Sequence, residues 1–317
     1  SDGAVVTTLS PAVVAAIDDL ELAARVVVEG LRVGGHRSPF HGYGAEFQQH
    51  RPYRAGDDLK YLDWKVYARS NRLYTRQFRE TTNVSVMLVL DTSASMAFPT
   101  SERAPQVVSK FRYASIVAAA LAYLASEQGN AVGLMTMTGG EMEYLPARSG
   151  RVHLRTLIAR IDGLKPAGTW QPATVIGRAA ELLQRRGLMM VLSDFYDDES
   201  GTQRELRHIV QRGHDAAMLQ IVAREERSLE FRQQVELEDL ESGQRQLIEP
   251  ATANAAYQNA LAAFLERCRS FAQHEGIDYG LLDCGESPER ALRDYLVRRS
   301  TRQASPSLPS VQHATQR

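Results

Sequence analysis

The sequence has little cysteine and no histidine pattern typical of metal sites. Only Cys268 and Cys284 occur among its 317 residues, too few for a disulfide framework or a cysteine-ligated metal cluster. The eight histidines form no His-x-x-x-His pair, so zinc on a helix is not expected. Reduced core thiols in a reducing compartment are the simplest interpretation.

The chain also lacks an excess of one charge and a long apolar run. Its formal net charge is −1 at pH 7, so the molecule as a whole has no strong attraction for nucleic acid or anionic membrane. The longest apolar run, 116–125, is mostly alanine and is too short to span a bilayer. Acidic residues between 2 and 21 stand where a signal peptide would be basic and then apolar. We expect a cytoplasmic protein without a membrane span.

Several common catalytic motifs are missing. There is no Gly-x-x-x-x-Gly-Lys phosphate loop and no Gly-x-Ser-x-Gly elbow, and the glycines at 42–44 lack the third glycine of a dinucleotide fingerprint. Nucleotide-dependent and serine-hydrolase chemistry are therefore disfavoured.

What the sequence does have is a short apolar run that ends abruptly in polar residues. Residues 84–96 read VSVMLVLDTSASM, which predicts a strand buried on both faces followed by a loop. In open α/β sheets, ligands bind where such strands end. Asp91, Ser93 and Ser95 are polar residues at alternate positions in this loop.

Similar runs alternate with helical patterns along the chain, which predicts a doubly wound, mainly parallel α/β sheet. One antiparallel edge strand is expected, because 131–138 and 141–147 are too close for a crossover helix. We divide the chain into a smaller mixed segment (1–80), the sheet domain (81–300) and a disordered tail (301–317). Other expected strands are 187–194, 215–222 and 278–283, with a hairpin at 235–248; expected helices are 111–127, 151–164, 172–186, 202–212, 254–274 and 288–299.

In the amino-terminal segment the patterns are weaker. One helix is expected over 11–33, mostly loop and turn over 34–58, short helical turns over 60–68, and a half-buried strand over 73–78.

Oxygen-bearing side chains in three loops predict a cation site. These loops hold Asp91 with Ser93 and Ser95, then Thr169, and then Asp194. Hydroxyl and carboxylate oxygens are ligands for a hard cation, so we expect Mg²⁺, with Mn²⁺ or Ca²⁺ as alternatives. The two serines could instead merely cap the next helical turn.

The motif and the element order resemble a von Willebrand factor A (VWA) domain with its metal-ion-dependent adhesion site. The segment before it carries a second pattern, formed by Gly44, Glu46, Phe47, Arg51, Tyr53, Gly56, Asp57, Asp58, Asp63, Trp64, Ala68 and Arg69. With these residues at this spacing, the segment resembles the bacterial domain-of-unknown-function 58 family, with Lys60 where arginine is expected. The resemblance implies that Asp91, Ser93, Ser95, Thr169 and Asp194 bind the metal in a non-catalytic protein that works beside a MoxR-type AAA+ ATPase.

Two other functions stay open. A metal-dependent phosphatase-like hydrolase would use Asp91 as its nucleophile, but the carboxylate that such chemistry needs two residues later is replaced by Ser93. A nucleic-acid adaptor would use the basic region from Arg51 to Arg79, since residues 25–80 hold eleven Lys or Arg against six Asp or Glu. We favour instead a polar layer in which these arginines pair with nearby acids; the expected layer comprises Arg51, Arg54, Arg69, Arg76 and Arg79 with Glu46, Asp57, Asp58, Asp63 and Glu80.

Overall fold

The structure is a computed structural model of the full chain. It describes residues 10–33, 45–54, 62–80, 84–99, 107–183, 186–227, 235–238, 245–248 and 250–304.

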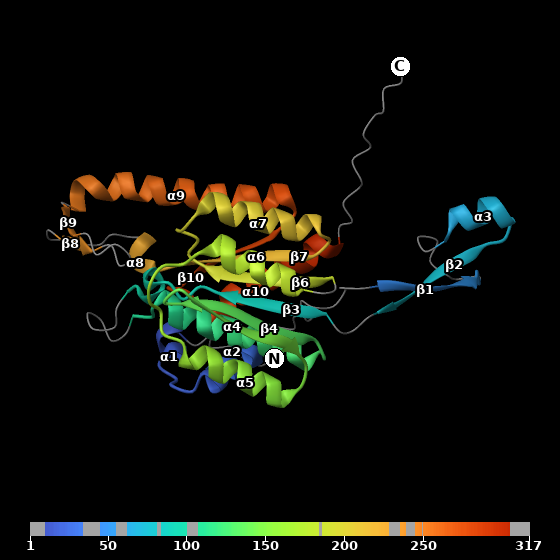
Figure 1. The fold of residues 1–317 in the computed structure, drawn as a ribbon, viewed down its shortest axis with the longest axis horizontal. Helices are drawn as coiled ribbons and strands as arrows, with labels where there is room; N and C mark the ends of the chain where they lie inside the picture. Colours follow the sequence, from blue (N-terminus) through green and yellow to red (C-terminus); the bar gives the residue numbers. More distant parts are fainter. Residues whose placement is uncertain are drawn as a thin grey trace, which may run out of the picture.

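A six-stranded sheet forms the centre of the molecule (Figure 1). Its strand order is β10-β7-β6-β3-β4-β5, in which every neighbouring pair is parallel except β4 and β5. The predicted doubly wound, mainly parallel sheet with one antiparallel edge strand is confirmed. The strands are β3 (Ser85–Leu90), β4 (Ala131–Thr138), β5 (Glu141–Arg148), β6 (Gly187–Ser193), β7 (Asp215–Val222) and β10 (Asp278–Asp283).

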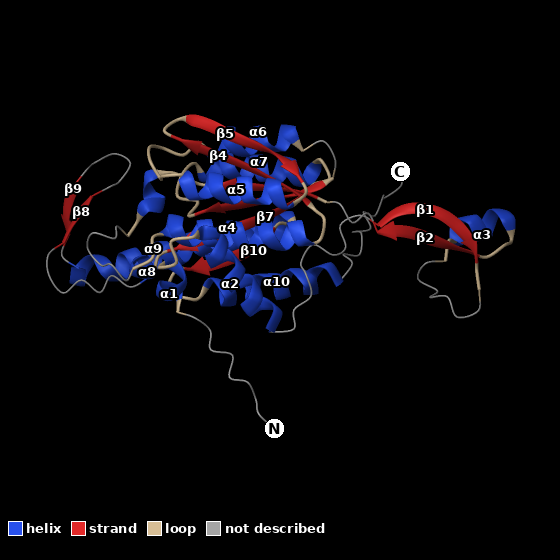
Figure 2. Ribbon diagram, turned by 90° about the horizontal axis from the view of Figure 1, so that it is seen from below, coloured by secondary structure: helices blue, strands red, loops and turns tan. Residues whose placement is uncertain are grey.

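Three helices lie on one face of the sheet, and two more pack on the outside of these three. Among them α4 is almost entirely buried, and its run of alanines lets it pack closely against both the sheet and the neighbouring α2. Figure 2 looks onto this side of the sheet from below. The helices are α1 (Pro11–Ala15), α2 (Leu20–Val33), α4 (Lys110–Glu127), α5 (Arg151–Gly163) and α10 (Pro288–Ala304).

Three helices cover the opposite face, with a second apolar core beneath them. They are α6 (Pro172–Leu182), α7 (Glu199–Gln211) and α9 (Pro250–Glu275). Because both faces are covered, β3 and β6 are buried along nearly their whole length. Polar groups can therefore reach solvent only at the ends of these strands.

An arm projects away from the sheet and its helices (Figures 1 and 2). It consists of β1 (Ala45–Pro52) paired antiparallel with β2 (Tyr74–Glu80), together with α3 (Trp64–Ser70). The strand at 73–78 and the helical turns near 60–68 were expected, but the loop predicted over 34–58 is wrong where β1 lies. The reason is that β1 gains its hydrogen bonds from a partner strand that is distant in sequence. Residues 34–44 and 55–61 lie outside the described part.

The single helix expected over 11–33 is also wrong, because α1 ends at Ala15 and α2 begins at Leu20. The Asp19 carboxylate accepts the Leu22 N–H at 3.1 Å, so the acidic pair at 18–19 starts a new helix instead of continuing the first. Both helices share the core with α4. The boundary at residue 80 stays a prediction.

At the other end, α10 continues to Ala304, four residues into the expected tail; residues 305–317 lie outside the described part. The expected hairpin is present as β8 (Val235–Glu238) paired with β9 (Arg245–Ile248). No helix in the described ranges is long and apolar enough to cross a membrane.

Candidate functional site

Asp91 lies immediately after β3, at the carboxyl end of the sheet, and its carboxylate is held on both sides. Oδ1 accepts the Ser93 N–H at 2.8 Å, and Oδ2 accepts the hydroxyl of Ser193, the last residue of β6, at 2.5 Å. The Asp91 side chain is buried. Neither oxygen is therefore free to move without breaking a hydrogen bond.

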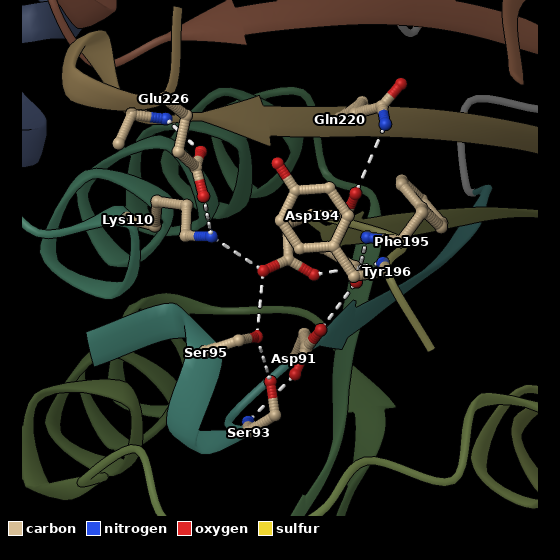
Figure 3. Close-up of polar contacts among 11 residues, drawn as sticks. Asp91, Ser93, Ser95, Lys110, Asp194, Phe195, Tyr196, Gln220 and Glu226 are labelled. Atoms are coloured by element: carbon tan, nitrogen blue, oxygen red, sulfur yellow. Dashed lines mark hydrogen bonds and ion pairs between the residues drawn. The ribbon is translucent and has the colours of Figure 1, made fainter. Parts of the chain in front are cut away.

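The two serines of the loop continue from Asp91 toward the neighbouring strand. Ser93 precedes a short 3₁₀ turn, η2 (Ala94–Ala97), and its Oγ lies 3.0 Å from the Oγ of Ser95. The Ser95 hydroxyl donates to Oδ2 of Asp194 at 2.8 Å. Three side-chain oxygens from two strand-end loops thus form a continuous row (Figure 3).

The turn after β6 directs Asp194 into this row. Phe195 adopts a left-handed backbone conformation with φ of 61°, which is unfavourable for a residue with a side chain. Two local hydrogen bonds hold the turn: Phe195 N–H donates to Ser193 Oγ at 2.9 Å and Tyr196 N–H to Asp194 Oδ1 at 3.2 Å. Gln220, on β7, donates to the Asp194 carbonyl at 3.1 Å. Strain of this kind, restrained on several sides, is typical of functional sites.

The sequence reasoning missed two residues of the site, Lys110 and Glu226. Lys110 is the first residue of α4, and its ammonium lies 2.8 Å from Asp194 Oδ2 and 2.7 Å from Glu226 Oε1 (Figure 3). Glu226 lies in the short helix α8 (Arg224–Arg227) after β7, where its other oxygen accepts the Ala223 N–H at 2.8 Å. The ring of Tyr196 packs over the ammonium, 4.8 Å from its centroid. Three adjacent strands, β3, β6 and β7, therefore each supply a carboxylate.

Burial and charge change the protonation equilibria of this cluster. Burial, reinforced by the nearby Asp194, raises the pKa of Asp91 to about 7. Burial also raises the pKa of Glu226, although its contact with Lys110 opposes that shift. Burial alone would lower the pKa of Lys110, but the charges of Asp194 and Glu226 outweigh it and raise the pKa above its ordinary value. Lys110 is therefore charged at neutral pH.

Thr169, the fifth predicted residue, is placed differently. Its loop is tied to the Asp91 loop by backbone hydrogen bonds, from Ala94 N–H to the Gly168 carbonyl and from Ala167 N–H to the Thr92 carbonyl, both at 2.9 Å. The Thr169 side chain is exposed, and no hydrogen bond in the described structure links it to the other four residues. The structure thus brings together Asp91, Ser93, Ser95 and Asp194 and leaves Thr169 at the rim.

The oxygens of this row are also of the kind that bind a small hard cation. Their separations of 3.0 Å and 2.8 Å are those of ordinary hydrogen bonds. Because neighbouring ligand oxygens in an octahedral Mg²⁺ site are about 2.9 Å apart, a cation that replaced the hydrogen-bonding protons would require little movement of these oxygens. Among the described residues, no group of three His, Cys, Asp or Glu side chains is arranged to hold a metal. A cation here would therefore depend on the hydroxyls of Ser93 and Ser95 as well as on Asp194.

The fold and the cluster define a class of protein: a doubly wound α/β domain with an oxygen-rich site where the strand order reverses between β3 and β6. Comparison with known families identifies the family of the chain. The family model DUF58, described as a protein of unknown function, matches residues 49–266. The chain belongs to the DUF58 family.

Curated relatives have similar sequences. One is the uncharacterized protein Rv1480 of Mycobacterium tuberculosis, 32% identical over 240 residues that cover 74% of this chain and 72% of the relative. Another is the uncharacterized protein YeaD of Bacillus subtilis, 28% identical over 111 residues that cover 35% of this chain and 24% of the relative.

Two solved structures are similar to part of this chain. The conserved hypothetical protein BatB from Bacteroides thetaiotaomicron has a TM-score of 0.45 at 15% identity, covering 69% of this chain and 99% of that one. The VWA domain of SpRpn10 has a TM-score of 0.34 at 16% identity, covering 44% of this chain and 75% of that one.

Proposed function

We propose that this protein is a non-catalytic, divalent-cation-dependent protein-binding module that acts as an adaptor or chaperone-like partner of a MoxR-type AAA+ ATPase. One observation carries the cation part of the proposal: the oxygens of Ser93, Ser95 and Asp194, which come from two strand-end loops, converge in one hydrogen-bonded row. We propose Mg²⁺ as the cation, with Mn²⁺ and Ca²⁺ as alternatives, because all three are hard cations that bind oxygen ligands. The ATPase is proposed on the family resemblance alone.

Each residue of the cluster has a distinct role in the proposed site. Ser93, Ser95 and Asp194 hold the cation. Asp91 fixes the position of the loop that carries the two serines, because its carboxylate accepts the Ser93 N–H. Thr169, exposed at the rim, lies on a loop hydrogen-bonded to the Asp91 loop, and we propose that it contacts the partner. When bound, the cation supplies positive charge and a coordination position for an anionic oxygen, which we propose is an Asp or Glu of the partner.

The environment of Asp91 supports a binding role over the hydrolase alternative. A carboxylate nucleophile needs an oxygen that is free to attack, whereas both oxygens of Asp91 accept hydrogen bonds from within the protein. Ser93, which stands where the second carboxylate of such an enzyme is needed, is buried. This arrangement makes Asp91 a support for the loop and not an attacking group.

Calorimetric titration of Mg²⁺ into the purified protein tests the site. We expect binding in the wild type and its loss in Asp91→Ala and Ser95→Ala, because the first change removes the support of the loop and the second removes one ligand. Ser126→Ala, at the opposite end of α4, is the matched control and should bind as the wild type does. Equal Mg²⁺ affinity in all four proteins would show that the site is wrongly assigned.

The partner is tested by an affinity pull-down with and without chelator, over a range of salt concentrations. Metal-dependent capture of an AAA+ ATPase that is lost in Ser95→Ala would support the proposal. If instead the basic region from Arg51 to Arg79 carries the interaction, capture should fall steeply with salt and ignore chelator. That second pattern would favour the nucleic-acid or charge-driven alternative.

A further inference from the structure

The site contains a cation of its own, which the resemblance to metal-binding domains does not explain. The ammonium of Lys110 contacts Asp194 Oδ2, the same oxygen that accepts the Ser95 hydroxyl. Only 1% of the Lys110 side chain is exposed. The oxygen that would serve a divalent cation is therefore already neutralised by the protein itself.

The position of this lysine runs against local rules for helices. Lys110 is the first residue of α4, directly after the N-cap Ser109, where the helix dipole disfavours a positive charge. Burial of an ammonium is costly as well unless good partners surround it. Two carboxylates and an aromatic ring supply those partners. A lysine that breaks both rules and is still fully paired indicates a role in the site and not a helix-surface residue.

We infer that Lys110 is a tethered cation that shares Asp194 with the divalent cation and thereby sets the affinity of the site for metal. Glu226 is the positioning residue that holds the ammonium between two anions, so that Asp194 does not bind it alone. This inference rests on the cation site proposed above. In the metal-free site, Lys110 holds the carboxylates together, and a metal ion must compete with the ammonium for Asp194.

The charges of the cluster allow this effect to be separated from a general change in charge. With all groups ionised, Asp91, Asp194, Glu226 and Lys110 carry two net negative charges. The double variant Lys110→Met/Glu226→Gln removes one positive and one negative charge, so the cluster still carries two negative charges. Any gain in metal affinity in this variant then comes from loss of the competing ammonium.

Mg²⁺ affinity of the full chain, measured by isothermal titration calorimetry, provides the test. We expect Lys110→Met/Glu226→Gln to bind Mg²⁺ at least tenfold more tightly than the wild type. Glu226→Gln alone should bind more weakly, because the ammonium then has Asp194 as its main anion. The control Arg207→Met/Glu275→Gln removes a distant ion pair, whose nitrogen and oxygen are 2.9 Å apart, and should match the wild type.

The possible results separate the two proposals. Unchanged or weaker binding by the cluster double variant, with binding retained in the wild type, would overturn the role of Lys110 and leave the metal site standing. No Mg²⁺ binding by the wild type or by any variant would overturn the metal site itself. Far-UV circular dichroism of each variant confirms that the comparison is made between folded proteins. If the double variant is unfolded, the single variant Glu226→Gln decides: binding equal to or tighter than the wild type would refute the inference.

Discussion

Replacing Lys110 by methionine should strongly destabilise the protein when metal is absent. Methionine fills a volume similar to that of the lysine stem, so the change removes mainly the ammonium and its bonds to Asp194 and Glu226 at 2.8 Å and 2.7 Å. At an effective dielectric constant of about 20, each pair at this distance gains on the order of 6 kcal/mol before desolvation is counted. Most of this gain offsets the cost of burial, but removal of one partner leaves uncompensated carboxylates, which typically costs about 3–5 kcal/mol.

The assay is urea denaturation in the presence of chelator, followed by circular dichroism. We expect the free energy of unfolding to fall by about 3–5 kcal/mol in Lys110→Met and by clearly less in Lys110→Arg, which keeps the charge. Saturating Mg²⁺ should recover part of the loss, because a ligand that binds only the folded state stabilises it. A loss below about 1 kcal/mol in chelator would refute the reasoning, since an exposed ion pair is worth no more than that.

Two further predictions concern the same protein. The pKa of Asp91 is raised to about 7 in the folded state and lies near 3.9 in the unfolded chain. Between about pH 4 and about pH 7 the folded state therefore binds more protons than the unfolded state. In chelator, the free energy of unfolding should fall as pH rises from about 4 to about 7. Asp91→Asn should flatten this dependence in urea midpoints, and an unchanged slope would contradict the assignment. Gly187→Ala should cost about 1–3 kcal/mol, because its Cβ would lie 2.6 Å from the Ser85 carbonyl oxygen; Gly163→Ala, with open space around it, is the control, and equal effects would argue against a steric cause.

The sheet could be predicted because its strands carry their own signal. β3 and β6 are short apolar runs buried on both faces, and the two glycines at 139–140 mark the hairpin that makes β5 antiparallel. β1 could not be predicted in this way, because its pairing with β2 depends on a partner about thirty residues away and not on alternation within 45–52. The break between α1 and α2 was readable in principle, since the acidic pair at 18–19 is a common start for a helix.

The positions of most residues in the candidate site could likewise be predicted from the sequence, whereas the orientation of one side chain could not. Asp91, Ser93 and Ser95 share one loop, and Asp194 repeats the pattern of a strand ending in polar residues, so sheet topology alone brings them together. Thr169 was placed correctly on a loop bonded to the Asp91 loop, but side-chain orientation cannot be read from position in the sequence. The structure leaves that side chain exposed at the rim.

Lys110 and Glu226 were beyond sequence reasoning for a physical reason. They lie 84 and 32 residues from Asp194 along the chain, so neither residue's sequence neighbours indicate its partners. A signal was nevertheless present: lysine at the first position of a helix, followed by a strongly apolar segment, opposes the helix dipole. Such a conflict between a residue and its local setting is resolved only by partners elsewhere in the fold. For Lys110 those partners are the carboxylates that end β6 and follow β7, so the violation itself points to the site.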